Sequence, residues 1–117
     1  MSDVPLERTL RVFYRDYGRD LVVPSTAPES LPADRVTALA EHILISEDSF
    51  LGMVDRNDTI LQCYLADDAA RLTLELVYPE ASGCLRLTLP REQALERLAD
   101  LPELFDEALL PGAQYIA

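Results

Sequence analysis

The sequence predicts a single α+β domain over residues 1–117, in which an antiparallel sheet packs with two or three helices. We expect the sheet to combine an N-terminal hairpin with a four-stranded meander. The chain has 117 residues, of which 49% are hydrophobic, and this suits one domain with a proper core. Four short strand-like segments, separated by polar loops, follow one another between residues 50 and 89, as in a meander. Segments with helical spacing of apolar residues flank this series.

The N-terminal segment 6–17 allows two interpretations. Its apolar residues have helical spacing, but it is also rich in β-branched and aromatic residues. The same enrichment recurs in Leu21–Val23, and Asp16-Tyr17-Gly18 between the two is typical of a turn. We favour a β-hairpin with strands near 8–15 and 19–24, and keep a helix over the first segment as the alternative.

A proline-rich stretch and a helix come next. Three prolines between residues 24 and 32 predict a stiff, non-helical connection. Pro32 suits the first turn of the following helix, Asp34 favours the positive end of its dipole, and Ser30 is a candidate cap. The helix itself is predicted by apolar residues at positions i, i+3, i+4, i+7 and i+8, which are Val36, Leu39, Ala40, Ile43 and Leu44.

The meander has a predictable register, because opposed residues must point to the same face. Its expected strands are Phe50–Asp55, Thr59–Ala66, Arg71–Tyr78 and Cys84–Leu89. Matching the alternating leucines gives the pairs Leu72–Leu89, Leu74–Leu87, Leu76–Leu85, Leu65–Leu72, Cys63–Leu74 and Leu61–Leu76. This register sets Glu75 opposite Arg86 and beside Gln62, with Tyr64 beside Thr73.

A second helix is expected near Pro90–Leu101, with an apolar stripe of Ala94, Leu95, Leu98 and Leu101. Pro102 interrupts it. Apolar residues between 104 and 109 allow one or two further turns before Pro111-Gly112.

The charge of the chain is one-sided. There are 21 acidic residues against 10 basic ones, which gives a net charge of −11, and lysine is absent. Such a chain repels nucleic-acid phosphates, and it cannot supply the lysine of a phosphate loop or a Schiff base. No apolar run reaches the roughly 18 residues of a membrane span, and the N-terminus does not resemble a signal peptide. We therefore expect a cytoplasmic protein that contacts neither nucleic acid nor membrane.

Motifs for catalysis, metal binding or cofactor binding are lacking, so we predict no catalytic residue, metal or cofactor. The segment Asp55–Ile60 begins like a calcium loop but lacks the required glycine, and is interpreted as a hairpin turn. The two cysteines, Cys63 and Cys84, are expected to be free thiols. The enzyme alternative needs a pocket built around Asp67, Asp68, Glu47 or the single histidine, His42.

The outer face of the meander is the candidate functional surface. We expect it to carry apolar residues around a polar trio, namely Leu51, Met53, Ile60, Tyr64 and Val77 around Gln62, Glu75 and Arg86. The first interpretation is that the N-terminal hairpin or a helix covers part of this face, and the alternative is a partner-binding surface. The candidate partner-binding residues are Met53, Tyr64 and Glu75, flanked by Asp67 and Asp68.

Several segments together resemble small bacterial immunity proteins, the antidotes encoded beside polymorphic toxins. The resemblance lies in Arg11–Val23 before a helix and a meander, in Asp58–Gln62 followed by Glu75, and in the helix opening Leu89–Glu92. It implies a cytosolic protein that neutralises a toxin by binding it, without catalytic residues. Many such proteins are acidic because many of their toxins are basic, and this chain fits that pattern. A small acidic secretion chaperone is the second interpretation, although such chaperones usually begin with a helix.

Overall fold

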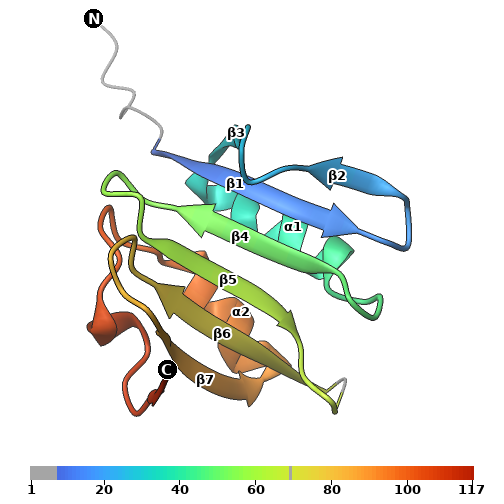
Figure 1. Cartoon of the computed structure of the whole chain (residues 1–117). Coiled ribbons are helices and arrows are strands. Elements are labelled where there is room, and N and C mark those ends of the chain that lie inside the picture. The colour runs from blue at the N-terminus through green and yellow to red at the C-terminus, as the bar shows by residue number, and fades with distance from the viewer. Residues whose placement is uncertain (1–7, 69) are drawn as a thin grey trace, which may run out of the picture.

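The fold is one antiparallel sheet with helices on one side. The computed structural model describes residues 8–68 and 70–117, whose eight strands form a single sheet (Figure 1). The strand order is β2-β1-β4-β5-β6-β7-β8, and β3 also pairs with β1. In chain order the strands are β1 Thr9–Asp16, β2 Leu21–Val23, β3 Glu29–Pro32, β4 Phe50–Val54, β5 Ile60–Leu65, β6 Arg71–Val77, β7 Cys84–Pro90 and β8 Gln114–Ile116. The predicted α+β class is confirmed.

Two α-helices, α1 (Val36–Ile43) and α2 (Arg91–Ala99), lie behind the sheet in Figure 1 and cover the same face of it. They bury their apolar stripes against a core of strand side chains that are almost fully shielded from water, among them Val12, Leu51, Met53, Leu61, Cys63, Leu72, Leu74 and Leu76. Short 3-10 turns precede α1 (η1, Ala33–Arg35) and follow α2 (η2, Glu107–Leu109). Within the described residues, no helix is both long enough and apolar enough to cross a membrane.

The N-terminal hairpin is confirmed. Tyr14 pairs with Val23 and Asp16 with Leu21, so β1 and β2 are joined by a tight turn. Asp20 in that turn adopts a φ of 54°, a left-handed conformation that Asp tolerates better than most residues. The helix alternative for segment 6–17 is wrong for the described residues, and residues 6 and 7 lie outside them.

The proline-rich stretch is non-helical, as predicted, but it is more than a connection. Its second half is strand β3, in which Ser30 pairs with Arg11 of β1 and Pro32 pairs with Thr9. Proline is tolerated there because β3 is an edge strand, so its missing N–H breaks no ladder on the outer side. Ser30 is therefore part of the sheet and not a helix cap. The position before α1 is occupied by Arg35, whose side chain makes no capping hydrogen bond.

The predicted register of β5, β6 and β7 is confirmed pair by pair. All the leucine and cysteine pairs expected from alternation are present, as are Glu75 opposite both Arg86 and Gln62, and Tyr64 opposite Thr73. A shift of the register by one residue would turn the buried leucines to the outer face, so burial of the leucines specifies the register. The short loops between the strands restrict the register further.

The C-terminal region forms one further helical turn, within the one or two expected, and adds a strand that was not predicted. After α2 the chain forms only the single turn η2, whose first residues are held by the Asp106 carboxylate accepting from the Ala108 N–H at 2.9 Å. An unpredicted strand, β8, then pairs Arg86 with Gln114 and Cys84 with Ile116. Three residues are too few to reveal a strand by periodicity, so only the pairing with β7 defines β8.

Candidate protein-binding face

The face of the sheet opposite the two helices is not covered by any described helix (Figure 1). We call it the outer face. The register aligns its side chains in three rows across the strands. The first row is Val22, Arg15, Phe50, Tyr64, Thr73 and Thr88; the second is Phe13, Gly52, Gln62, Glu75, Arg86 and Gln114; the third is Ser30, Arg11, Val54, Ile60, Val77, Cys84 and Ile116.

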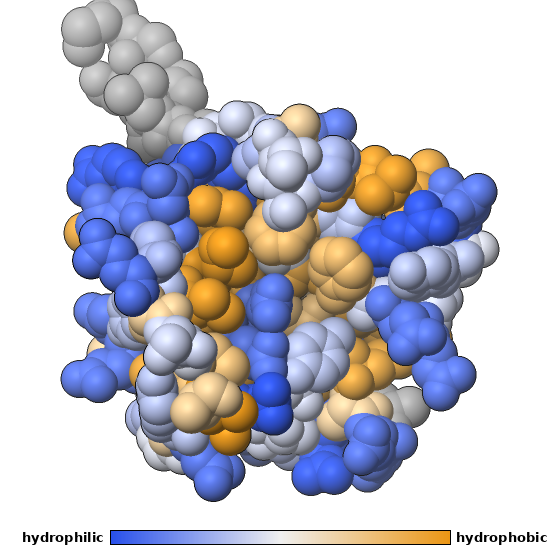
Figure 2. All heavy atoms as spheres, in the orientation of Figure 1, coloured by the Kyte–Doolittle hydropathy of each residue, from blue (hydrophilic) through white to orange (hydrophobic). Residues whose placement is uncertain are grey.

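The third row supplies most of the apolar area. From Val54 to Ile116 it places five apolar side chains on five successive strands, most of them half-buried. Figure 2 looks onto this face and shows a band of hydrophobic surface next to a hydrophilic column. A hollow of about 310 Å³ opens where the row meets the polar residues, lined among others by Val77, Cys84 and Arg86. Such continuous apolar area on one open face is a feature of interaction surfaces.

Two phenylalanines occupy the centre of the β1–β4 side. The Phe13 ring lies over Gly52, because a Cβ on that glycine would come within 2.1 Å of the ring. Phe50 meets Phe13 edge to face, with ring centroids 6.3 Å apart and an interplanar angle of 62°. Phe13 is buried by its neighbours, whereas Phe50 is 37% exposed. Gly52 therefore makes room for an aromatic cluster whose exposed member is Phe50.

The Glu75 carboxylate is the polar centre of the face. It accepts hydrogen bonds from Gln62 Nε2 at 2.7 Å, from the Tyr64 hydroxyl at 2.8 Å and from Arg86 Nε at 2.6 Å. The donors come from β5 on one side and β7 on the other, as the register predicts. Glu75 is only 6% exposed. Charge-assisted hydrogen bonds of this kind fix the side chains of three strands in one arrangement.

The pKa values of this network follow from its geometry. Burial alone would raise the pKa of Glu75, but the hydrogen bonds from Gln62, Tyr64 and Arg86 outweigh it and hold the pKa below its usual range. Burial and the neighbouring Glu75 carboxylate raise the pKa of Tyr64 to about 12. At neutral pH the carboxylate is thus ionised and the phenol protonated, so neither is poised to exchange a proton.

Acidic side chains gather at one end of β4 and β5. Glu47 and Asp48 lie in the loop before β4, and Asp67 and Asp68 lie in the loop after β5. The two loops share an end of the sheet because β4 and β5 are antiparallel, with Phe50 opposite Tyr64. All four acids are exposed. They border the outer face on the side of its first row, and we call them the acidic rim.

The candidate residues predicted from the sequence are only partly brought together. Tyr64 and Glu75 lie in one network, and Asp67 and Asp68 stand at the rim near Tyr64. Met53 was expected on the outer face, and this is wrong: it is fully buried beneath α1 and α2, opposite Leu61. Leu51 is misplaced in the same way, opposite Cys63.

The cause of that error is the composition of β4. Every residue of Phe50–Val54 is apolar or glycine, so alternation does not reveal which side faces the core. The turn at Asp55–Thr59 could have revealed the side, because extending the β5 register through it pairs Val54 with Ile60. This pairing places Phe50, Gly52 and Val54 on the outer face. Sequence reasoning therefore missed Phe13, Phe50 and Val54 as residues of the face.

Of the residues of the enzyme alternative, Glu47, Asp67 and Asp68 lie in the acidic rim, and His42 lies in α1. His42 Nδ1 lies 3.1 Å from Arg19 Nη2. No cluster of three or more metal-ligating side chains occurs among the described residues. Both cysteines are free, as predicted. Burial raises the pKa of the Cys63 thiol to about 12, so it is neutral as well as inaccessible.

The hairpin-turn interpretation of Asp55–Ile60 is confirmed. The Asp55 side chain accepts from the backbone N–H groups of Asn57 and Thr59 through one oxygen and of Phe105 through the other. Its oxygens are thus used by the protein itself, and they tie the C-terminal segment to the β4–β5 turn.

Comparison with known proteins found no matching family model, no matching curated protein and no matching solved structure.

Proposed function

We propose that this chain is a non-enzymatic protein-binding module whose outer face docks a basic protein, in the manner of a cytoplasmic bacterial antidote that neutralises a toxin. The observation that carries the proposal is the outer face itself. It joins an apolar row, an exposed phenylalanine and a fully hydrogen-bonded polar centre on one open side of the sheet. Interfaces commonly combine an apolar and aromatic core with a polar rim, and this face has that composition.

The distribution of charge supports a basic partner. The arginines of the outer face are already compensated, since Arg11 pairs with Asp58 at 2.9 Å, Arg15 with Asp20 at 2.8 Å, and Arg86 with Glu75. In the acidic rim Asp68 pairs with Arg71 at 3.7 Å, whereas no ion pair of the described residues involves Glu47, Asp48 or Asp67. The chain as a whole carries −11. Opposite net charges steer the encounter of two proteins, while apolar contacts and aromatic anchors supply most of the affinity.

The state of the polar centre supports binding in preference to catalysis. The Glu75 carboxylate accepts hydrogen bonds from Gln62, Tyr64 and Arg86, and the pKa of the Tyr64 phenol is about 12. A network saturated in this way is a rigid feature that a partner can recognise without first reordering it. The role as an antidote and the cytoplasmic location rest on the resemblance of Arg11–Val23, Asp58–Gln62 and Leu89–Glu92 to immunity proteins.

The experiment is partner capture from the native host with a matched pair of variants. Val77→Arg places a charge in the apolar row of the outer face. Gln93→Arg places the same charge on an exposed position of α2, on the helix side. We expect the wild-type chain and Gln93→Arg to capture one basic protein that Val77→Arg loses, and the captured protein to arrest growth unless this chain is co-expressed. Capture that is equal for both variants would contradict the outer face as the binding surface.

A further inference from the structure

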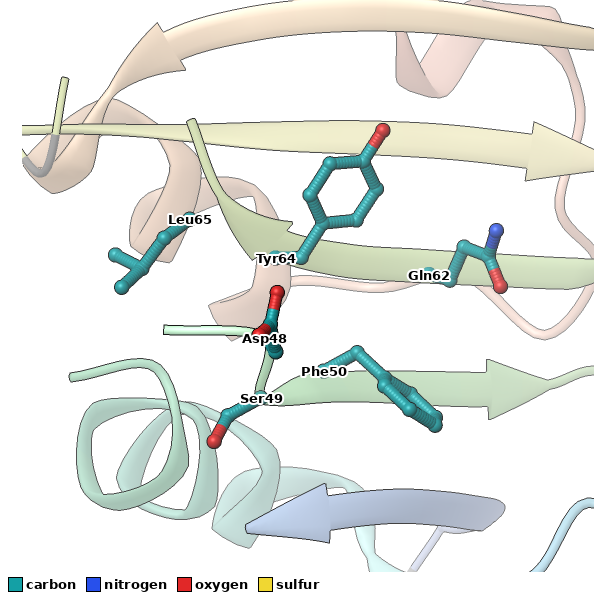
Figure 3. Close-up of a pocket in the computed structure, with 6 residues that line it drawn as sticks. All are labelled: Asp48, Ser49, Phe50, Gln62, Tyr64 and Leu65. Carbon is teal, nitrogen blue, oxygen red and sulfur yellow. The ribbon is translucent and has the colours of Figure 1, made fainter. Parts of the chain in front are cut away.

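A hollow of about 350 Å³ lies at the edge of the outer face, where the first row meets the acidic rim. Figure 3 shows its lining, which comes from the start of β4, the end of β5 and the residues just before β4. The lining residues are Asp48, Ser49, Phe50, Gln62, Tyr64 and Leu65. The volume is at the small end of ligand pockets, which span roughly 300 to 1,000 Å³. It therefore suits one long side chain better than a cofactor.

Two aromatic rings form the walls of this hollow. Phe50 and Tyr64 are directly opposed across β4 and β5. The Tyr64 ring is held from its far end, because its hydroxyl donates to Glu75 at 2.8 Å. Phe50 is braced by its edge-to-face contact with Phe13. The hollow thus offers two aromatic faces whose positions are set before any ligand arrives.

A carboxylate lies beside the two rings. In Figure 3 the Asp48 carboxylate lies to the left of the Tyr64 and Phe50 rings, in the lining of the same hollow. Its backbone has a φ of 66°, which fixes the loop in a tight turn at this point. No ion pair of the described residues involves Asp48, so its charge is available. Ser49 is fully buried, and its hydroxyl accepts from the Tyr17 N–H at 3.0 Å.

We propose that this hollow receives an arginine side chain of the protein partner. The inference rests on the proposed function and names the chemistry of its anchor. A guanidinium is planar, stacks on aromatic faces and hydrogen-bonds a carboxylate through two N–H groups at once. The rings of Phe50 and Tyr64 provide the faces, and Asp48 provides the carboxylate. A lysine ammonium is a strongly hydrated point charge and gains less from the aromatic walls.

The test uses methylguanidinium as the probe and follows backbone amide shifts of the wild-type chain by NMR. Methylammonium at the same ionic strength is the comparison. We expect saturable shifts at the lining residues with methylguanidinium, and binding about threefold weaker with methylammonium. Asp48→Asn should weaken the binding of methylguanidinium by about fivefold, the size of an exposed ion pair. Asn is suitable there because it tolerates the left-handed backbone of Asp48.

Two further variants complete the design. Phe50→Leu keeps the wall apolar but removes a π face, and should weaken the binding by about threefold. Asp34→Asn removes the same charge from an exposed position of η1 and should change nothing. Each spectrum reports folding directly, since an unfolded variant loses its amide dispersion. Binding that does not saturate, or that is equal in Asp48→Asn and Asp34→Asn, would overturn the arginine site.

The outcome is separable from that of the proposed function. If methylguanidinium fails to bind but Val77→Arg still loses the captured partner, the outer face stands and the arginine site is wrong. If methylguanidinium binds as expected but capture is indifferent to Val77→Arg, the hollow is a guanidinium site and the docking face is wrong.

Discussion

The Tyr64 hydroxyl donates a 2.8 Å hydrogen bond to Glu75 Oε2, the same oxygen that Arg86 Nε reaches at 2.6 Å. The bond joins β5 to β6 across the centre of the outer face and holds the Tyr64 ring in place at the hollow that it lines with Phe50. A surface that is ordered before association loses less conformational entropy on binding. This contact therefore stabilises the sheet and should also strengthen binding at the proposed interface.

The first prediction concerns the titration of Tyr64. Its pKa of about 12 arises from burial first and from Glu75 second. Glu75→Gln removes the second cause and leaves the first, so the pKa of Tyr64 should fall but stay above the ordinary value of 10.0. NMR of ring-labelled tyrosine measures it, and Glu92→Gln, the same change at an exposed position of α2, is the control. An unchanged pKa would mean that the hydrogen bond is absent.

The same network predicts how stability depends on alkaline pH. The folded-state pKa of Tyr64 is raised, so its stabilising effect is complete below about pH 10 and is lost as the pH rises toward 12. The free energy of unfolding of the wild-type chain should therefore fall more steeply in this range than that of Tyr64→Phe. Denaturant titrations of both proteins at several pH values provide the comparison, and parallel pH profiles would count against the account.

The second prediction concerns the core. Leu74 is fully buried on the inner face between Cys63 and Leu87. Leu74→Ala should lower the free energy of unfolding by about 2–5 kcal/mol, because it removes buried methyl groups and leaves a cavity. Leu104→Ala, at a side chain that is 39% exposed, should cost much less. Equal losses for the two variants would show that the inner face is wrongly assigned.

The third prediction concerns Asp55, which is 2% exposed and accepts from three backbone N–H groups. Asp55→Ala leaves these donors without their partner and should lower the free energy of unfolding by about 3 kcal/mol. Asp106→Ala removes a single, exposed capping bond and should cost about 1 kcal/mol. Urea titration separates the two, and a loss at Asp55 no larger than at Asp106 would contradict the tie between the turn and the C-terminal segment.

The fourth prediction separates the rate of association from the lifetime of the complex. Replacing Asp67 and Asp68 by Asn removes charge from the acidic rim without touching the outer face, so it should mainly slow association with the captured partner, most clearly at low salt. Tyr64→Ala removes an aromatic anchor and should mainly raise the dissociation rate. Surface plasmon resonance resolves both rates. The reverse assignment of effects would show that the rim, not the face, makes the lasting contact.

Much of the fold was accessible from the sequence, for reasons that particular residues illustrate. The leucines of β6 and β7 alternate strictly, and short loops fix their partners, so the register and the Glu75–Arg86 pair could be predicted. The side of β4 that faces the core could not be predicted, because β4 is apolar on both sides and alternation carries no information there. Strands β3 and β8 were missed because each is short and is defined only by its neighbour.

The candidate site was predictable to the same extent. Tyr64 and Glu75 follow from the register, but the Phe13–Phe50 cluster depends on the space over Gly52, which only three-dimensional packing reveals. The position of Asp48 beside Phe50 and Tyr64 depends on a left-handed residue in a loop, and periodicity does not predict such a conformation.

The docking of a partner on the outer face is tested most directly by the reactivity of the two native cysteines. Cys84 is half-buried in the apolar row of that face, whereas Cys63 is fully buried on the other side of the sheet and serves as an internal reference. Iodoacetamide should alkylate Cys84 in the free protein and leave Cys63 unmodified. With the captured partner bound, we predict that Cys84 is protected, while a thiol introduced by Gln93→Cys on α2 reacts at its former rate. Unchanged alkylation of Cys84 in the complex, with protection of the thiol on α2, would place the interface on the helices and contradict the account.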